Sequence, residues 1–87
     1  MNEQVKPDEK KPAELYYAHG LEVESFVVGS IVCFDATRAA TGLVRHFHLT
    51  ILDVSEQMLY RCSQLDYSEI ELELFPCGNG VNIVMTS

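Results

Sequence analysis

The sequence predicts an α+β fold, in which a small antiparallel β-sheet is covered by one short helix at about residues 54–65. Three observations lead to this prediction. Polar and apolar residues alternate strictly in the segment 69–74, as in a half-buried strand. A turn-forming segment at 76–80 precedes a final apolar run. Residues 53–65 have the spacing of a capped amphipathic helix.

The chain has 87 residues, which is enough for one compact domain. Its first 13 residues contain two prolines, charges of both signs that cancel, and a single large aliphatic residue, Val5. This composition predicts a flexible N-terminal tail over 1–13. Aromatic and aliphatic residues become frequent from Leu15 onward. We therefore expect a single compact strand-rich domain over 14–87.

Two strands are predicted in the first half of the domain. In the segment 21–28, LEVESFVV, polar and apolar residues alternate, with Leu21, Val23 and Val27 on one side. Gly29 interrupts this run. The following segment 30–35, SIVCFD, is rich in β-forming residues and predicts a second short strand.

A third strand is predicted at 47–52, FHLTIL. Its apolar residues Phe47, Leu49 and Ile51 share one face, and the opposite face carries His46, His48 and Thr50.

The C-terminal region predicts a β-hairpin. In the segment 69–74, EIELEL, the apolar residues Ile70, Leu72 and Leu74 point one way and three glutamates point the other way. The segment 76–80, PCGNG, supplies the turn, and an apolar strand follows at 81–85.

Two segments are ambiguous. In 54–65, Asp53 and Glu56 have capping-box spacing, and the helical positions are Met58, Leu59, Cys62 and Leu65. The same region also alternates as a strand, although we favour the helix. In 36–46, a helix capped by Asp35 would contain Gly42, which costs about 1 kcal/mol relative to alanine. A loop or a single helical turn, followed by a strand from Leu43, fits this second segment equally well.

A strand at 54–65 would give five or six short strands at regular spacing, and thus a small all-β barrel. The stretch from VGSIVCFD through TGLVRHF to YRC and EIELELFP resembles SH3-like β-barrels in its turn glycines and strand spacing. The resemblance implies an alternative fold class, a small SH3-like all-β barrel, and assigns no functional residue.

Charge and hydropathy limit the partners. The net charge is −7, and residues 14–87 hold three arginines against ten acidic residues. Such a surface neutralises phosphates poorly, so we expect neither direct nucleic-acid binding nor binding to anionic membranes. No apolar run approaches the roughly 18 residues of a membrane span, and the N-terminus lacks the apolar region of a secretory signal. A cytoplasmic location is expected.

The cysteines and histidines give no recognisable metal motif. Cys33, Cys62 and Cys77 are odd in number and widely spaced, which predicts reduced thiols that act as small buried hydrophobic residues. His46 and His48 share a strand face and lie about 6.6 Å apart along it, close enough to share a metal. Two imidazoles do not make a site, however, and the sequence does not place a third ligand beside them. We therefore predict no metal and no cofactor.

The sequence also contains no catalytic signature, such as a nucleophile elbow, and we expect no enzymatic activity. The row of Glu69, Glu71 and Glu73 is its most informative feature. Such a row keeps an outer strand soluble, or it serves as a recognition face for a basic surface. The acidic residues expected to extend this face are Asp53, Glu56 and Asp66.

These observations predict a non-enzymatic protein-interaction module that binds a protein with a basic surface. In its sharper form, the protein is an acidic inhibitor that blocks the nucleic-acid channel of its partner. Two other classes remain open: a small-ligand or metal-binding protein that uses the histidines and a cysteine, and a self-assembling accessory subunit. A homo-oligomer is expected, because the core is small and the apolar strand 81–85 would otherwise be an exposed edge.

Overall fold

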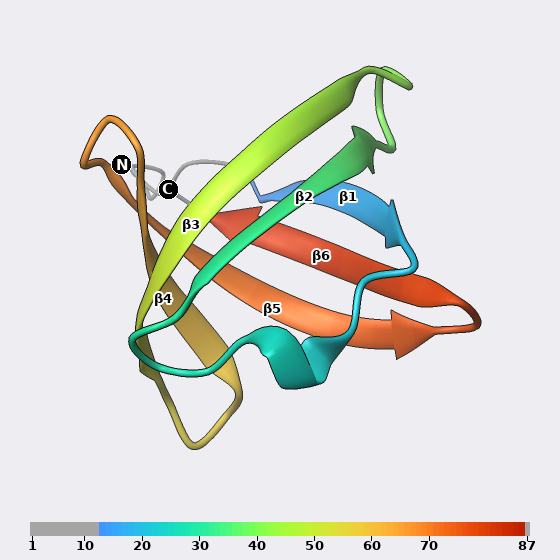
Figure 1. Ribbon diagram of the computed structural model, residues 1–87. Coiled ribbons are helices and arrows are strands. Elements are labelled where there is room, and N and C mark those ends of the chain that lie inside the picture. Colours follow the sequence, from blue (N-terminus) through green and yellow to red (C-terminus); the bar gives the residue numbers. More distant parts are fainter. Residues whose placement is uncertain (1–12, 87) are drawn as a thin grey trace, which may run out of the picture.

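The computed structural model describes residues 13–86, which form a closed antiparallel barrel (Figure 1). Six strands follow one another around the barrel in chain order. The strands are β1 (Glu14–His19), β2 (Ile31–Arg38), β3 (Val44–Val54), β4 (Leu59–Gln64), β5 (Glu69–Cys77) and β6 (Gly80–Thr86), and the short 3-10 helix η1 spans Val23–Ser25. The last strand, β6, closes the barrel by pairing with β1 from Glu14↔Met85 to His19↔Gly80.

This architecture fits the SH3-like all-β alternative better than the α+β arrangement, and the helix predicted at 54–65 is wrong. Strand β3 continues to Val54, and β4 begins at Leu59 after a tight turn. The hydroxyl of Ser55 accepts hydrogen bonds from the backbone N–H groups of Gln57 and Leu59. Met58 has a φ of 62°, a left-handed conformation that a right-handed helix excludes. The side chain of Ser55 therefore stabilises a turn where the apolar spacing predicts a helix.

Pairing on both sides explains why the strand is preferred over the helix here. Strand β4 pairs with β3 on one side and with β5 on the other. Its residues Tyr60 and Cys62 point into the core, whereas Met58 and Leu65 from the predicted apolar helix face are exposed. Long-range strand pairing thus overrides a local helical pattern.

The strand predicted at 21–28 is also wrong. This segment contains η1 and lies at one end of the barrel (Figure 1). The ring of Phe26, on the side expected to be polar, is buried 5.9 Å from the ring of Phe34 and 5.5 Å from that of Tyr60. Val27 is exposed instead. The segment thus covers the end of the core with the buried ring of Phe26 and the partly buried side chains of Leu21 and Val23.

The other predicted elements are confirmed with longer bounds. The strands predicted at 30–35, 47–52 and 69–74 correspond to β2, β3 and β5, with Ser30 just before β2, and the C-terminal hairpin is formed by β5 and β6. The ambiguous segment 36–46 is the end of β2, a loop and the start of β3. Gly42 has a φ of 74° in this loop and donates its N–H to the carbonyl of Arg38.

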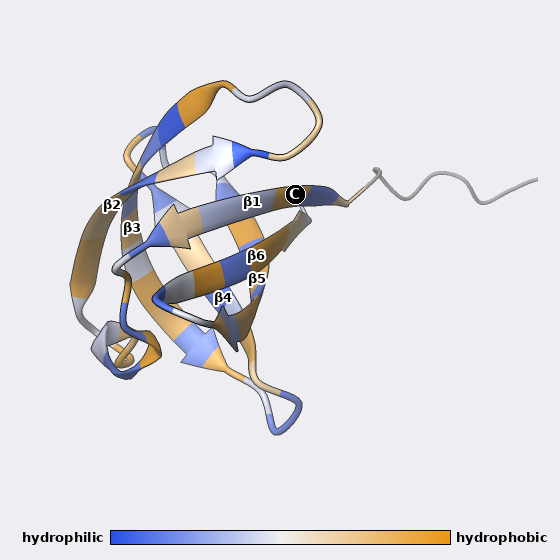
Figure 2. Cartoon of the chain, turned by 90° about the vertical axis from the view of Figure 1, so that its right-hand side faces the viewer, coloured by the Kyte–Doolittle hydropathy of each residue, from blue (hydrophilic) through white to orange (hydrophobic). Residues whose placement is uncertain are grey.

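The core fills the inside of the barrel. Phe47 lies at its centre, with its ring edge-to-face against Tyr16 at 5.3 Å and stacked on Phe34 at 5.0 Å. Side chains alternate along each strand, so every second one points outward. Figure 2 shows hydrophilic and hydrophobic residues interspersed along the strands. The largest fully buried side chains come from four strands: Phe47, Leu49, Ile51, Cys62, Ile70, Leu72, Val81 and Ile83.

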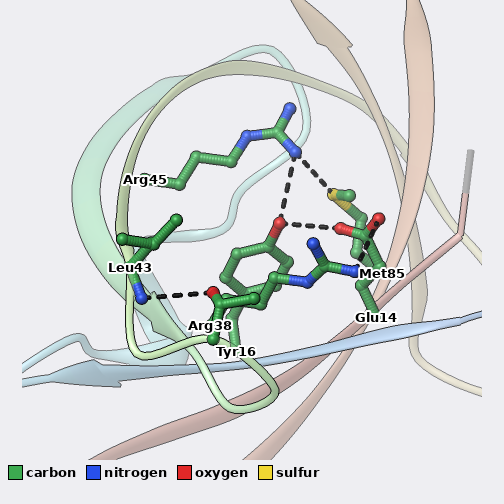
Figure 3. Close-up of polar contacts among 7 residues, drawn as sticks. Glu14, Tyr16, Arg38, Leu43, Arg45 and Met85 are labelled. Atoms are coloured by element: carbon green, nitrogen blue, oxygen red, sulfur yellow. Dashed lines mark hydrogen bonds and ion pairs between the residues drawn. The ribbon is translucent and has the colours of Figure 1, made fainter.

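Polar side chains fill one end of the barrel (Figure 3). The guanidinium group of Arg45 points inward from β3 and donates hydrogen bonds to Gln64 Oε1 at 2.6 Å and to the Tyr16 hydroxyl at 3.4 Å. It also lies 4.7 Å from the centroid of the Phe47 ring, a cation–π distance. The Tyr16 hydroxyl donates in turn to Glu14 at 2.7 Å. Both terminal nitrogens of this part-buried arginine thus have hydrogen-bond partners, which connect β3 with β1 and β4.

The closed barrel removes one reason for expecting self-association. Strand β6 pairs with β5 and with β1, so the segment 81–85 is not an exposed edge. The oligomeric state stays a prediction, which now rests only on the small size of the core. The tail predicted at 1–13 falls almost entirely on residues 1–12, which lie outside the described residues.

Candidate functional site

The outward side chains of β3, β4 and β5 form an acidic surface. Asp53, Arg61 and Glu71 are cross-strand partners in one row. Glu69 and Glu73 flank Glu71 on β5. We call this surface, consisting of Asp53, Glu69, Glu71, Glu73 and Arg61, the acidic face.

Arg61 neutralises only part of the acidic face. Its guanidinium lies 3.2 Å from Glu69, and the side chains of both residues are about half exposed. An exposed pair of this kind contributes about 0.2–1 kcal/mol. The acidic face has four carboxylates and one guanidinium, so its net charge is negative. Its side chains are exposed to solvent, except for Glu73, which is half-buried.

The structure brings together four of the six predicted partner-binding residues. Glu69, Glu71 and Glu73 lie on the outer side of β5, and Asp53 joins them from β3. Glu56 lies in the exposed turn between β3 and β4, next to the acidic face.

Asp66 has a different setting, in the loop between β4 and β5. Its carboxylate accepts hydrogen bonds from the backbone N–H and the hydroxyl of Ser68, at 3.0 and 2.6 Å. These two hydrogen bonds lower the pKa of Asp66 below its ordinary value. Asp66 therefore stabilises its own loop, at the end of β4 opposite to Glu56.

A second outward surface is apolar and adjoins the acidic face. Along the strands, Glu73 pairs with Val84, and Val84 pairs with Leu15 on β1. Phe75, two residues after Glu73, and Tyr17, two residues after Leu15, lie on the same outer side, and both pair with the polar Asn82 of β6. Figure 2 shows β1 and β6 side by side on this part of the barrel. We call the set of Leu15, Tyr17, Phe75 and Val84 the apolar stripe.

The apolar stripe is not covered by the barrel itself. Leu15 is 45% exposed and Phe75 is 49% exposed, while Tyr17 and Val84 are half-buried. This surface was not predicted from the sequence, because the predicted strand stopped at residue 74 and no strand was predicted at β1. Continued alternation from Glu71 through Glu73 to Phe75 was the signal that could have revealed Phe75.

A third surface lies on the outer side of β2 and β3. Cys33 pairs with His48, and Asp35 pairs with His46. The Sγ atom of Cys33 lies 3.5 Å from Nδ1 of His48, and Nδ1 of His46 lies 2.7 Å from Oδ1 of Asp35. We call this group of four residues the histidine face. In the arrangement as it stands, no three Cys, His, Asp or Glu side chains within residues 13–86 are close enough together to hold a metal ion.

An open depression of about 240 Å³ adjoins the histidine face. It is lined by His46 and His48 and by the end of β4 with its loop, where Leu65 is exposed. Solvent and small molecules therefore have access to the β4 side of both imidazoles.

The cysteines divide into two groups. Cys62 is fully buried, and burial raises the pKa of its thiol to about 11. Cys33 and Cys77 are exposed, so the prediction that all three are buried is wrong for these two. Both lie at outward positions of their strands, because side chains alternate between the two faces. Cys33 follows the buried Val32, and Cys77 lies three residues after the inward-pointing Leu74.

Comparisons with known proteins found no matching family model, no matching curated protein and no matching solved structure. Within residues 13–86, there is no helix of sufficient length and hydrophobicity to span a bilayer.

Proposed function

We propose that this protein is a non-enzymatic interaction module, which binds the basic surface of another protein through its acidic face and its apolar stripe. The observation that carries the proposal is the continuity of these two surfaces on β5. Glu71, Glu73 and Phe75 follow one another on the outer side of this strand, so that carboxylates and an exposed aromatic ring adjoin.

This combination has the chemistry of a docking surface. Protein interfaces have an apolar centre, enriched in aromatic residues, and a polar rim. Phe75 and Leu15 supply exposed apolar area, and the carboxylates beside them favour a partner of positive charge. The apolar contact would supply most of the affinity, whereas complementary charge would raise the association rate and select the partner.

The rigidity of the barrel supports the same proposal. All the residues of the acidic face and the apolar stripe lie on strands that are paired on both sides. Binding through them orders little backbone, and the entropic cost of association is correspondingly small.

A partner that handles nucleic acid is the specific form of this proposal. Successive outward residues of a strand are about 6.6–6.8 Å apart, which is about twice the axial spacing of phosphates along one DNA strand. Glu69, Glu71 and Glu73 thus present negative charges at a repeat that a phosphate-binding surface accommodates. A protein that blocks such a surface would act as a competitive inhibitor of nucleic-acid binding.

The test compares two charge-matched double variants. Glu71→Gln with Glu73→Gln removes two charges from the acidic face, and Glu22→Gln with Glu24→Gln removes two charges from the segment around η1. We expect the control variant to bind a basic partner like the parent, and the Glu71/Glu73 variant to bind more slowly and with a weaker dependence on salt. A third variant, Phe75→Ser, should shorten the lifetime of the complex.

Four results would count against the proposal or its specific form. Equal affinity and salt dependence of the two double variants would show that the acidic face is only a solvated surface. Unchanged dissociation of Phe75→Ser would exclude the apolar stripe. Light scattering of the free protein that shows a dimer lost in Phe75→Ser would assign the stripe to a second copy of this chain. If nucleic acid does not compete for the partner, the inhibitor form is wrong.

A further inference from the structure

The histidine face combines four side chains that ligate or support transition metals, and they come from two paired strands. Cys33 and Asp35 are outward neighbours on β2, and His48 and His46 lie opposite them on β3. Thiolate, imidazole and carboxylate are the ligand types of Zn²⁺ in proteins. The strand register, rather than a flexible loop, fixes the four backbone positions.

The distance between Cys33 and His48 agrees with shared coordination of a metal. Zn–S and Zn–N bonds of about 2.3 Å and 2.0–2.1 Å, at the tetrahedral angle, place the two ligand atoms about 3.5–3.6 Å apart. The Sγ atom of Cys33 lies 3.5 Å from Nδ1 of His48. The distance between these two atoms therefore already equals the distance expected between two ligands of one tetrahedral ion.

His46 is arranged as a metal-binding histidine with a supporting carboxylate. Its Nδ1 lies 2.7 Å from Oδ1 of Asp35. Because an ionised carboxylate only accepts hydrogen bonds, Nδ1 carries a proton, and in the neutral imidazole the lone pair is then on Nε2, where a metal can bind. A histidine that ligates a metal through one nitrogen commonly donates its other N–H to a carboxylate in this way.

Coordination by His46 as well would require one movement. His46 is the outward neighbour of His48, about 6.6–6.8 Å away along β3, and its ring must turn so that Nε2 approaches the ion. The side chains of His46 and Asp35 are 65% and 67% exposed, so no packing opposes this rotation. The need for this rotation explains why three ligands do not yet converge.

We propose that Cys33, His46 and His48 bind one divalent transition-metal ion of the zinc class on the outer face of β2 and β3, with Asp35 as the hydrogen-bonding partner of His46. The thiol of Cys33 releases its proton to solvent when the ion binds. Three protein ligands leave the fourth position for water or for an exogenous group. The site shares no residue with the proposed docking surface, whose Asp53 lies at the far end of β3, and it does not depend on that surface.

Cobalt(II) is a suitable probe, because its visible spectrum reports tetrahedral geometry and thiolate ligation. The full chain, kept reduced, is titrated with Co²⁺ alone and then with Zn²⁺. We expect one ion per chain, a thiolate-to-cobalt charge-transfer band, and displacement of cobalt by zinc. At a Zn²⁺ concentration of 100 times Kd, the melting temperature should rise by roughly 10–20 °C.

Four variants locate the ion. Cys33→Ser should abolish the charge-transfer band, and Asp35→Asn should weaken binding by about 10–100-fold while keeping the band. Cys77→Ser and His19→Gln, which change an exposed cysteine and an exposed histidine elsewhere on the barrel, are the matched controls and should bind like the parent. Circular dichroism of the metal-free variants checks that each folds.

The proposal is overturned if the parent binds no cobalt in tetrahedral form. It is also overturned if the band survives Cys33→Ser, or if Cys77→Ser loses it equally. An unchanged affinity of Asp35→Asn would remove the carboxylate from the site. Residues 1–12, which lie outside the described part, contain neither cysteine nor histidine and cannot supply the thiolate band.

Discussion

Replacing Met58 by glycine should stabilise the barrel, although it removes a large apolar side chain. Met58 has a φ of 62° in the turn between β3 and β4. This left-handed conformation costs an L-residue about 1–2 kcal/mol and costs glycine nothing. The Met58 side chain is 53% exposed, so little packing is lost. The greater flexibility of glycine in the unfolded chain offsets about 0.5–1 kcal/mol, which leaves a net gain of about 0.5–1 kcal/mol.

The assay for this prediction is thermal unfolding followed by circular dichroism. A gain of this size corresponds to a rise in melting temperature of about 2–8 °C for a domain of this length. The matched control is Leu65→Gly, since Leu65 is also exposed but does not have a positive φ. This control should destabilise the protein by about 0.5–1 kcal/mol. If Met58→Gly lowers the melting temperature as much as Leu65→Gly does, the turn is not strained and the reasoning is refuted.

Four further predictions concern the stability of the barrel and the exposure of its cysteines. Changing Glu69, Glu71 and Glu73 to glutamine should alter stability by less than about 0.5 kcal/mol, because all three point away from the core; a larger loss in denaturant unfolding would contradict this orientation. Gly80→Ala should cost about 1–3 kcal/mol, since its Cβ would collide with the carbonyl of Ala18 and the ring of Tyr17; an unchanged melting temperature would show that β1 and β6 are farther apart. A thiol reagent should label two cysteines in the folded protein and Cys62 only after unfolding. Burial raises the pKa of Cys62 from 9.0 to about 11, so the buried neutral thiol contributes fully to the free energy of unfolding below pH 9, and this contribution is lost as the pH rises towards 11. Removal of residues 1–13 should shift the melting temperature by less than about 4–8 °C, as their composition suits a tail; a larger drop would mean that the segment packs on the barrel.

The C-terminal hairpin was predictable because its signals are local. Alternation in 69–74 and the glycines of the turn lie within a few residues of one another, and they determine both strands and their connection. Closure of the barrel depends instead on pairing between β1 and β6, which lie at opposite ends of the described chain. No local pattern reports such a pairing. The strand β1 was therefore missed, and the apolar stripe with it.

The two wrong elements show how the closed barrel overrides local pattern. The apolar spacing of 54–65 fits a helix, but a helix there would leave the edges of β3 and β5 unpaired. The alternation in 21–28 fits a strand, but the segment is used to bury Phe26 at the end of the core. In both cases, the requirement that decided the outcome involves residues distant in the sequence.

The candidate sites follow the same division between local and long-range information. The row of Glu69, Glu71 and Glu73 was predictable, since alternation on one strand is enough to place it. The pairing of Cys33 with His48 was not predictable, because it depends on the register of β2 and β3, which the loop at 39–43 sets. A slip of one residue would turn one strand's side chains to the other face and separate the thiol from the imidazole.

The acidic face and the histidine face are close on the barrel but should act independently. Thr50 on β3 pairs with Ser63 on β4, which pairs with Glu69 on β5. In this row, two neutral residues therefore separate β2 from Glu69 of the acidic face. Glu69 is thus two strand spacings, or about 10 Å, from Thr50 across the sheet, and His48 lies two residues farther along β3. Surface charges at that separation are largely screened at physiological salt, where the Debye length is about 8 Å. A metal ion at the histidine face would therefore leave the charge that a basic partner meets almost unchanged, and substitutions in the two faces should have additive effects.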